Sequence, residues 1–182
     1  MKATGIVRRI DDLGRVVVPK EIRRTLRIRE GDPLEIYTDR EGGIVLRKYS
    51  PIGELSQFSK QYAEALAQNT GYIVSITDRD QHIAVAGAGK KDLAKKAISR
   101  QLDTLMNQRE SLLAVKGERK FIPITEDGGE NYTAQVIYPI IAEGDASGTV
   151  ILTTKDDKVR MGEMEMKLAA SAASFLGRQL EQ

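Results

Sequence analysis

Residues 4–26 read TGIVRRIDDLGRVVVPKEIRRTL. Two β-prone stretches, 4–10 and 15–18, lie on either side of the turn-forming sequence DDLG at 11–14. Pro19 follows and suits the first position of a helix, where its missing N–H group costs nothing. The segment therefore predicts a β-hairpin followed by a short helix.

The predicted helix has two chemically different faces. At 100° per residue, Leu26 lies about 40° from Ile22, whereas Arg23, Arg27 and Arg24 lie about 100°, 140° and 200° from it. An apolar face can therefore anchor the helix while three guanidinium groups point away from the core.

A second hairpin is predicted over 34–48, with a turn at 40–43. The first 50 residues then hold only about a dozen sizeable apolar side chains, which is a marginal core for a domain of this size. The chain has no cysteine to staple it. We expect two chains to interleave their hairpins, which also covers the strand edges. A stable folded monomer of residues 1–53 at micromolar concentration would exclude this.

Positive charge is concentrated at the start of the chain. Residues 1–29 carry a net charge of +6, and since the whole chain carries +2, the remainder carries −4. A basic end on a mildly acidic body is typical of nucleic-acid binding. The charge distribution alone is equally compatible with a solvated basic face that has no binding partner. The nine basic residues are Lys2, Arg8, Arg9, Arg15, Lys20, Arg23, Arg24, Arg27 and Arg29.

The rest of the chain alternates helical and strand patterns after a Pro- and Gly-containing boundary at 48–53. This order predicts an α+β domain with an antiparallel sheet. Two helical stripes, one near Leu55–Leu66 and one in the final helix, either cover this sheet or pair with another copy. The expected helices are 54–69, 92–109 (with a break) and 161–179, and the expected strands are 72–77, 82–86, 120–124, 132–142 and 147–153.

Three motifs, TGIVR at 4–8, DLGRVVVP at 12–19 and EIRRTL at 21–26, closely resemble the AbrB family of transition-state regulators. The resemblance covers residues 1 to about 50. The whole chain also resembles relatives in which an AbrB-type domain is joined to a C-terminal GAF-like domain.

The resemblance implies a mostly β swapped-hairpin barrel, formed by two chains, over residues 1–50. It implies a linker at 51–53 and an α+β GAF-like domain with an antiparallel sheet over 54–182. This second domain is expected to oligomerise the chain into a tetramer and is a candidate ligand sensor, although no ligand-binding residue can be named.

The function implied is a sequence-specific, double-stranded-DNA-binding transcription regulator. It is expected to activate some sporulation genes and repress others, in the cytoplasm of the forespore and in association with the nucleoid. The family's DNA-contacting positions fall on Arg8, Arg15, Arg23 and Arg24, with Lys2 and Arg9 as additional phosphate contacts.

Other classes of function fit less well. His82 is the single histidine and has no partners for a triad or metal site, and without cysteine there is no thiolate ligand or nucleophile. The AGAGKK sequence at 86–91 lacks the spacing of a phosphate loop. We therefore expect no enzyme activity, no metal, no cofactor and no membrane partner.

Two alternatives remain open. An antitoxin can use the same barrel, but its C-terminal tail is typically disordered, whereas 54–182 is strongly patterned. An oligomerising effector sensor could bind DNA only when an unknown small molecule is present.

Overall fold

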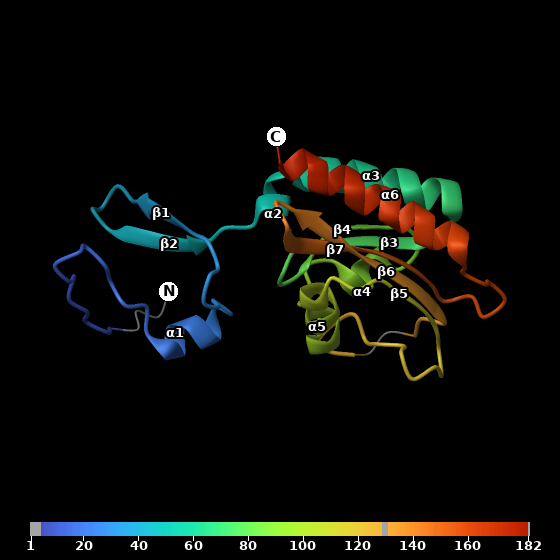
Figure 1. Cartoon of the computed structure of the whole chain (residues 1–182), viewed down its shortest axis with the longest axis horizontal. Helices are drawn as coiled ribbons and strands as arrows, with labels where there is room; N and C mark the ends of the chain where they lie inside the picture. Colours follow the sequence, from blue (N-terminus) through green and yellow to red (C-terminus); the bar gives the residue numbers. More distant parts are fainter. Residues whose placement is uncertain (1–4, 129–130, 182) are drawn as a thin grey trace. The chain divides into compact units, whose positions relative to one another are not determined.

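The computed structural model describes residues 5–128 and 131–181, which form two compact units, Met1–Tyr49 and Ser50–Gln182 (Figure 1). Lys2, one of the expected phosphate contacts, lies outside the described residues. None of the helices in the described ranges is both long and apolar enough to span a bilayer.

Over residues 5–49, the first unit contains one helix, α1 (Lys20–Thr25), and one antiparallel hairpin, β1 (Leu34–Thr38) with β2 (Ile44–Lys48). Asp39 shapes the hairpin turn, since its Oδ1 atom accepts hydrogen bonds from the backbone N–H groups of Gly43 at 2.7 Å and Glu41 at 3.0 Å. The second predicted hairpin is therefore present, close to its expected bounds.

The first predicted hairpin is not formed in the single chain: the described residues up to 18 contain its turn but no strands. Asp11 Oδ1 accepts from the N–H groups of Leu13 at 3.0 Å and Arg15 at 2.7 Å, which closes the turn. A strand needs a neighbour for its backbone groups, and no described strand of this unit pairs with either arm. Pro19 is the N-cap residue of α1, just before the first helical position.

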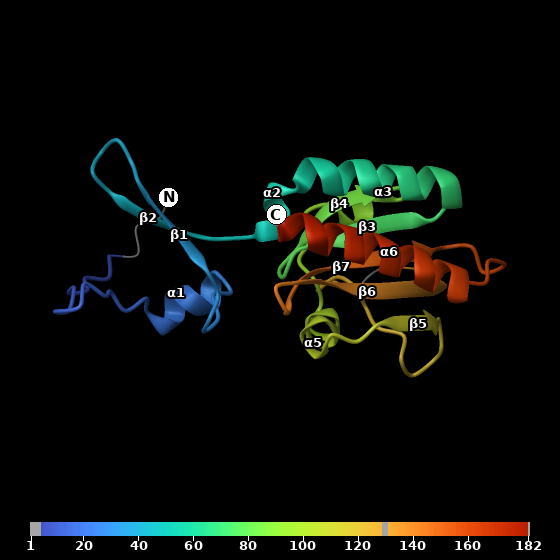
Figure 2. The same cartoon turned by 45° about the horizontal axis from the view of Figure 1, so that its top comes forward.

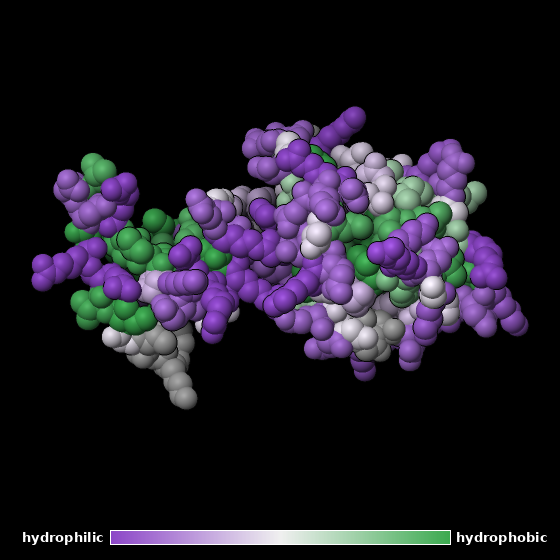
Figure 3. All heavy atoms as spheres, turned by 60° about the horizontal axis from the view of Figure 1, so that its bottom comes forward, coloured by the Kyte–Doolittle hydropathy of each residue, from purple (hydrophilic) through white to green (hydrophobic). Residues whose placement is uncertain are grey.

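The first unit also lacks an apolar core of its own. Both clusters of buried apolar side chains in the described chain begin beyond Tyr49. In contrast, Val7 is 87% exposed, Val17 72% and Ile36 70%. Figure 3 shows apolar side chains gathered on the surface of this unit. A single copy therefore does not bury its own apolar residues.

The second unit is built on a five-stranded antiparallel sheet with the strand order β4-β3-β7-β6-β5. The helices lie on its two faces, with α3 and α6 side by side on one face and α4 and α5 on the other (Figures 1 and 2). The strands are β3 (Ile73–Thr77), β4 (His82–Ala86), β5 (Leu112–Val115), β6 (Ala134–Ala142) and β7 (Asp145–Thr154), and the helices are α2 (Pro51–Glu54), α3 (Ser56–Thr70), α4 (Lys90–Leu93), α5 (Arg100–Gln108) and α6 (Glu163–Leu180).

Each face of the sheet buries a separate apolar cluster. Under α3 and α6, the sheet contributes Val74, Val136 and Leu152, all fully buried. The helix α6 approaches β6 closely at Gly177, where an added Cβ atom would overlap with the carbonyl oxygen of Ile141. A side chain at this position would push the helix off the sheet.

One predicted strand of this unit is corrected by the structure, and one predicted break is present. The strand predicted over 120–124 is absent, and the edge strand is β5 instead. Pro123 has no N–H group to donate to a ladder, and its carbonyl accepts from the hydroxyl of Ser99 at 2.5 Å. The helical segment predicted over 92–109 with a break is present as α4 and α5, with Lys95 at a positive φ of 62° between them.

The buried face of α3 also differs from the predicted stripe. The fully or nearly buried positions are Ser59, Ala63 and Ala67, whereas Phe58 is 50% exposed. The ring of Tyr62 instead stacks on Phe175 of α6, with 5.4 Å between ring centroids. The small residues let the helix sit close to the sheet, and Tyr62 and Leu66 are partly buried against the same apolar cluster.

Candidate nucleic-acid interface

The helix α1 presents the two adjacent arginines of the predicted site. The N–H group of Arg23 donates to the carbonyl of Pro19 at 2.9 Å, and the N–H of Leu26 donates to Ile22 at 2.9 Å, which fixes the short helix. Arg23 and Arg24 occupy its last turn, where a positive charge is favourable next to the helix carboxyl end.

These two arginines differ in their surroundings. Arg24 is exposed, whereas Arg23 is half-buried and its Nε atom is buried with no hydrogen-bond partner among the described residues. A guanidinium in this state costs free energy unless a further group reaches it. The single chain thus leaves Arg23 incompletely satisfied.

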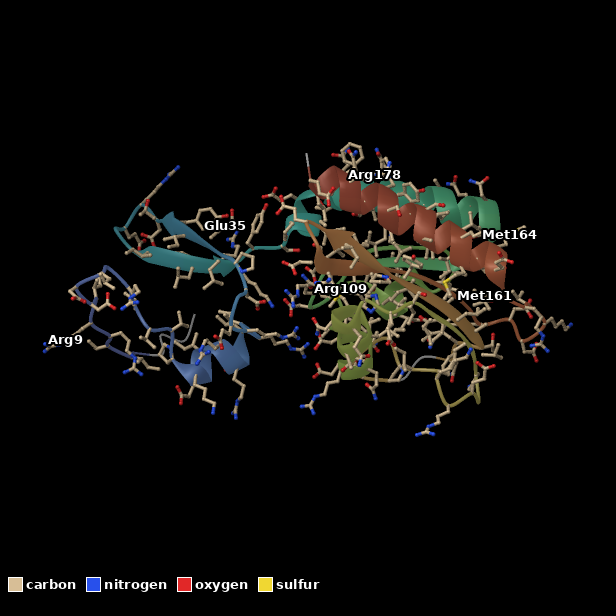
Figure 4. All side chains as sticks on the ribbon, viewed as in Figure 1. Arg9, Glu35, Arg109, Met161, Met164 and Arg178 are labelled. Atoms are coloured by element: carbon tan, nitrogen blue, oxygen red, sulfur yellow. The ribbon has the colours of Figure 1, made fainter. Side chains whose placement is uncertain are left out.

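Arg8, Arg9 and Arg15 lie on the two arms of the turn at 11–14, and all three are exposed. Figure 4 shows Arg9 extending away from the ribbon. Within the described residues, Arg8 and Arg9 make no ion pair, and neither do the two arginines of α1. Ion pairing with nearby carboxylates therefore does not account for most of the arginines predicted to bind DNA.

Arg15 is the exception, because its Nε atom lies 2.8 Å from Asp11 Oδ2. The backbone hydrogen bond from Arg15 and its side-chain hydrogen bond lower the pKa of the Asp11 carboxyl below its ordinary value. Both side chains are well exposed, so the pair contributes little to stability. A DNA phosphate could replace Asp11 as the partner of Arg15 at small cost.

A buried ion pair positions the loop that follows α1. Lys48 Nζ lies 3.1 Å from Asp32 Oδ2, and these side chains are 19% and 2% exposed. The same ammonium donates to the carbonyl of Arg27 at 3.0 Å, and Asp32 accepts from the N–H of Arg29 at 2.8 Å. This network, which the sequence pattern did not reveal, ties β2 to the end of the arginine-bearing helix.

The second unit places the remaining sequence candidates in structural roles. His82 opens β4 and is 1% exposed. Its Nε2 atom lies 3.2 Å from the carbonyl oxygen of Ile124, and its Nδ1 atom lies 2.6 Å from the hydroxyl of Ser75. Gly89 precedes α4, and Lys90 and Lys91 are exposed. No group of three potential metal ligands occurs within the described ranges.

Two protein families match parts of the chain. Residues 54–181 match the family described as stage V sporulation protein T C-terminal, transcription factor. Residues 7–54 match the family described as antidote-toxin recognition MazE, bacterial antitoxin. The two matches together cover both structural units.

Full-length and partial relatives were found among characterised proteins. The chain is 54% identical over 182 residues to stage V sporulation protein T of Bacillus subtilis, and the alignment covers 100% of both chains. It is 41% identical over 112 residues to the transition state regulatory protein AbrB of the same organism, covering 62% of this chain and 97% of AbrB.

The second unit resembles solved GAF domains. The cofactor-binding GAF domain of the nutrient sensor CodY from Clostridium difficile aligns with a TM-score of 0.52 and 18% identity, covering 71% of this chain and 92% of that domain. At this identity the likeness concerns the fold alone. The sequence prediction of a GAF-like domain with an antiparallel sheet is thereby confirmed.

Proposed function

This chain belongs to the stage V sporulation protein T family of transcription regulators, and we propose that it controls sporulation genes by binding double-stranded DNA through its first unit. The 54% identity over the full length is the observation that carries this function. The exposed arginines of the first unit supply a chemistry that fits it.

We propose that two copies of the first unit fold together. The apolar residues that one copy leaves exposed, among them Val7, Val17 and Ile36, are the material for a shared core. The arms around the turn at 11–14 lack strand partners within their own chain, and the arms of a second copy can provide them. An interleaved dimer accounts for both observations.

The dimer would display two sets of the arginines. We propose that Arg8, Arg15, Arg23 and Arg24 contact DNA, with Lys2 and Arg9 adding phosphate contacts. Neutralising phosphates supplies most of the affinity and makes binding depend steeply on salt. Arg23 and Arg24 are consecutive on α1, so their side chains point about 100° apart, and each is proposed to contact a different phosphate or base edge of the duplex.

The second unit is proposed to join two such dimers into a homotetramer. On α3 and α6, the ring of Tyr62 stacks on Phe175 (39% exposed), and Phe58 (50% exposed) and Met164 (71% exposed) are further exposed apolar side chains of these helices. Helices with such side chains commonly pack against a second copy. Joining two DNA-binding dimers raises affinity, because the second binding event becomes intramolecular.

The experiment is binding of the full-length protein to a sporulation promoter fragment across a salt series. We expect Arg23→Ala/Arg24→Ala to weaken binding strongly and to reduce the slope of log K against log salt by about 0.9 for each phosphate that is no longer neutralised. The control is Arg100→Ala/Arg160→Ala, which removes two exposed arginines of the second unit. Equal binding by the two double variants would refute the assignment of the α1 arginines.

The tetramer is tested separately by sedimentation. Phe175→Asp would place a charge on the outer face of α3 and α6, and we expect it to convert tetramers to dimers. DNA binding by the remaining dimer should become weaker without being lost. A tetramer that persists in this variant would show that another surface joins the dimers.

We further propose that the second unit senses a small effector and carries out no catalysis. A GAF fold with no cysteine favours binding over thiol chemistry. The protein is proposed to act in the cytoplasm of the forespore, in association with the nucleoid. The antitoxin alternative is favoured by the family match at 7–54, but the packed second unit differs from a disordered toxin-binding tail.

A further inference from the structure

The turn at 11–14 is organised by the side chain of Asp11. Its Oδ1 atom accepts hydrogen bonds from the backbone N–H groups of Leu13 at 3.0 Å and Arg15 at 2.7 Å. The backbone adds two further bonds, from the N–H of Asp11 to the carbonyl of Arg15 at 3.0 Å and from the N–H of Gly14 to the carbonyl of Asp11 at 3.1 Å. The carboxylate is therefore fixed relative to the backbone of the turn.

The second oxygen of this carboxylate holds the side chain of Arg15. Asp11 Oδ2 lies 2.8 Å from Arg15 Nε and accepts its N–H. A guanidinium group has four more N–H groups on its two terminal nitrogens, and these donate to no other group among the described residues. Because the Arg15 side chain is 69% exposed, its terminal nitrogens are open to a ligand.

Arg15 differs in this respect from the other arginines of the same turn. Arg8 and Arg9 are exposed and have no carboxylate partner within the described residues. Their long side chains keep their rotamer freedom and can follow a phosphate. Arg15 is attached through Nε to a group that the turn holds in place, so it loses less conformational entropy on binding in one particular direction.

The carboxylate of Asp11 also favours one kind of partner for Arg15. The hydrogen bonds from the backbone and the side chain of Arg15 lower the pKa of this carboxyl, which is therefore ionised at neutral pH. A phosphate that displaces Asp11 breaks only an exposed ion pair, but the carboxylate stays beside it, held by two N–H groups. Two negative charges at such a distance repel each other. An uncharged acceptor avoids this repulsion and leaves the ion pair intact.

The major-groove edge of guanine is an uncharged partner with matching geometry. It presents two acceptors side by side, O6 and N7, which the two terminal nitrogens of an arginine can bind with parallel hydrogen bonds. Adenine and cytosine present a donor on this edge, and thymine presents a single acceptor beside a methyl group. An arginine held through Nε therefore selects guanine over the other three bases.

We propose that Asp11 positions Arg15 to recognise a guanine in the major groove, whereas Arg8 and Arg9 neutralise phosphates. Asp11 is a positioning residue, because it acts through Arg15 and makes no contact with the DNA itself. The inference rests on the proposed DNA binding by the first unit and assigns a base to one of its arginines. Within this turn, base recognition and phosphate neutralisation thus belong to different side chains.

The test uses the full-length protein and a sporulation promoter fragment in which single guanines are replaced, one at a time, by 7-deazaguanine. This analogue has a carbon atom in place of N7 and still pairs with cytosine. We expect the parent to bind about fivefold to tenfold more weakly when the recognised guanine is replaced. Equal binding at every position would overturn the proposal. A parent that binds no promoter DNA would refute the proposed function itself, so the two failures are distinguishable.

Asp11→Asn separates positioning from folding. The asparagine keeps an oxygen for the N–H groups of Leu13 and Arg15, but its amide nitrogen cannot accept from Arg15 Nε. We expect the 7-deazaguanine effect to disappear, while affinity for a scrambled fragment of equal length stays the same or rises, because a negative charge is removed. A purely structural role would weaken binding to both fragments and would overturn the proposal.

Asp12→Asn is the matched control, since it removes the same charge from an exposed neighbour that makes no bond to Arg15. It should retain the full 7-deazaguanine effect. If the control loses the effect as Asp11→Asn does, the charge of the turn is responsible and the bond to Arg15 is not, which overturns the proposal.

A third variant keeps the test decisive if Asp11→Asn does not fold. Arg15→Lys retains the positive charge but has no planar pair of terminal nitrogens. We expect it to lose the 7-deazaguanine effect and to keep the salt dependence of the parent. A slope of log K against log salt that falls by about 0.9 would show that Arg15 neutralises a phosphate, and the assignment to guanine would then be wrong.

Discussion

The two units of this chain differ in how far they bury their apolar side chains. The second unit buries Ile76, Val136 and Leu152 completely under its own helices. The first unit leaves residues of the same type, such as Val17 and Ile36, about 70% exposed. A unit of some 130 residues can enclose a core, whereas one of about 50 residues cannot do so easily.

The exposure of an apolar side chain therefore has to be interpreted differently in the two units. An apolar side chain on the surface of the second unit is an ordinary surface residue or part of a contact face. In the first unit such side chains are so numerous that they imply a missing partner. Substitutions at equally exposed positions should therefore have very different effects in the two units.

The largest effect is expected for Ile36→Asp in the first unit. This position is 70% exposed in the single chain, so a charge there would be harmless if the unit stayed alone. In a shared core the aspartate would be buried without a partner, which prevents folding. We expect hydrogen exchange to show loss of protection across residues 5–49, together with loss of DNA binding.

Glu41→Ala, in the turn of the same hairpin, is the control and should leave both properties unchanged. Protection of the first unit in the parent protein should also increase with protein concentration, since its folding is coupled to association. If Ile36→Asp shows the same hydrogen exchange and the same DNA binding as the parent, the exposed apolar residues of the first unit do not form a shared core.

The next largest effect is expected for Leu152→Ala in the second unit. Leu152 is fully buried in the central strand β7, and its truncation leaves a cavity under α3 and α6. We expect a loss of about 2–5 kcal/mol in the free energy of unfolding, measured by urea denaturation. Unlike the effect in the first unit, this loss should not depend on protein concentration once the tetramer has been dissociated by Phe175→Asp.

Much of this architecture could be predicted from the sequence because local patterns specify local structure. The hairpin at 34–48, the helix before Gly71 and the long final helix were found within a few residues of their bounds. Gly71 ends α3 with a φ of 74°, a conformation for which glycine is suited. These predictions succeeded because turn residues and helix-cap residues mark where the elements begin and end.

The errors have a different physical origin, because they involve tertiary context. The arms at 5–10 and 15–18 have strand propensity, but a strand also needs a neighbour, which the single chain lacks. The segment 120–124 looks β-prone, yet Pro123 and the bond from Ser99 hold it outside the ladder. The stripe of α3 was found only in part, because Ser59, Ala63 and Ala67 are its most buried positions.

The candidate site shows the same division. The arginines of the candidate site could be predicted from the distribution of charge and from the family motifs. The Lys48–Asp32 pair could not be predicted, because it depends on residues that only the fold brings together.

A moderate effect is expected for Asp32→Ala. This substitution tests how much a buried ion pair, as opposed to apolar burial, stabilises the first unit. This substitution removes the carboxylate that accepts from Lys48 and from the N–H of Arg29. We expect a loss of about 1.5–3 kcal/mol in the stability of the first unit, the range for hydrogen bonds to charged groups. Concentration-dependent thermal melts report this loss.

The double variant Asp32→Leu/Lys48→Met is the matched control. It replaces both charges by apolar groups of similar size and should recover part of the lost stability. If the double variant is less stable than Asp32→Ala, the pair is required for more than charge compensation. DNA binding should follow stability in both variants, because the network holds the loop behind α1.

The smallest effect is expected at the start of α6 and depends on pH. Glu165 accepts hydrogen bonds from the N–H of Gly162 at 2.6 Å and from the hydroxyl of Tyr72 at 2.9 Å. Burial raises the pKa of its carboxyl, but the hydrogen bonds from the backbone N–H groups of Gly162 and of Glu165 itself, and from Tyr72, outweigh burial. The pKa of Glu165 is therefore lowered from its ordinary value of 4.5.

A carboxyl with a lowered pKa in the folded state stabilises the protein above its unfolded pKa, and this stabilisation is lost as the pH falls through the folded pKa. At neutral pH, Glu165→Gln should cost about 0.3–1 kcal/mol, as is typical for a charge at a helix amino end. The difference in melting temperature between the parent and Glu165→Gln should shrink as the pH falls below 4.5. Because Glu165 belongs to the second unit, exchange protection of residues 5–49 should stay the same, and a change there would show that the units are energetically coupled.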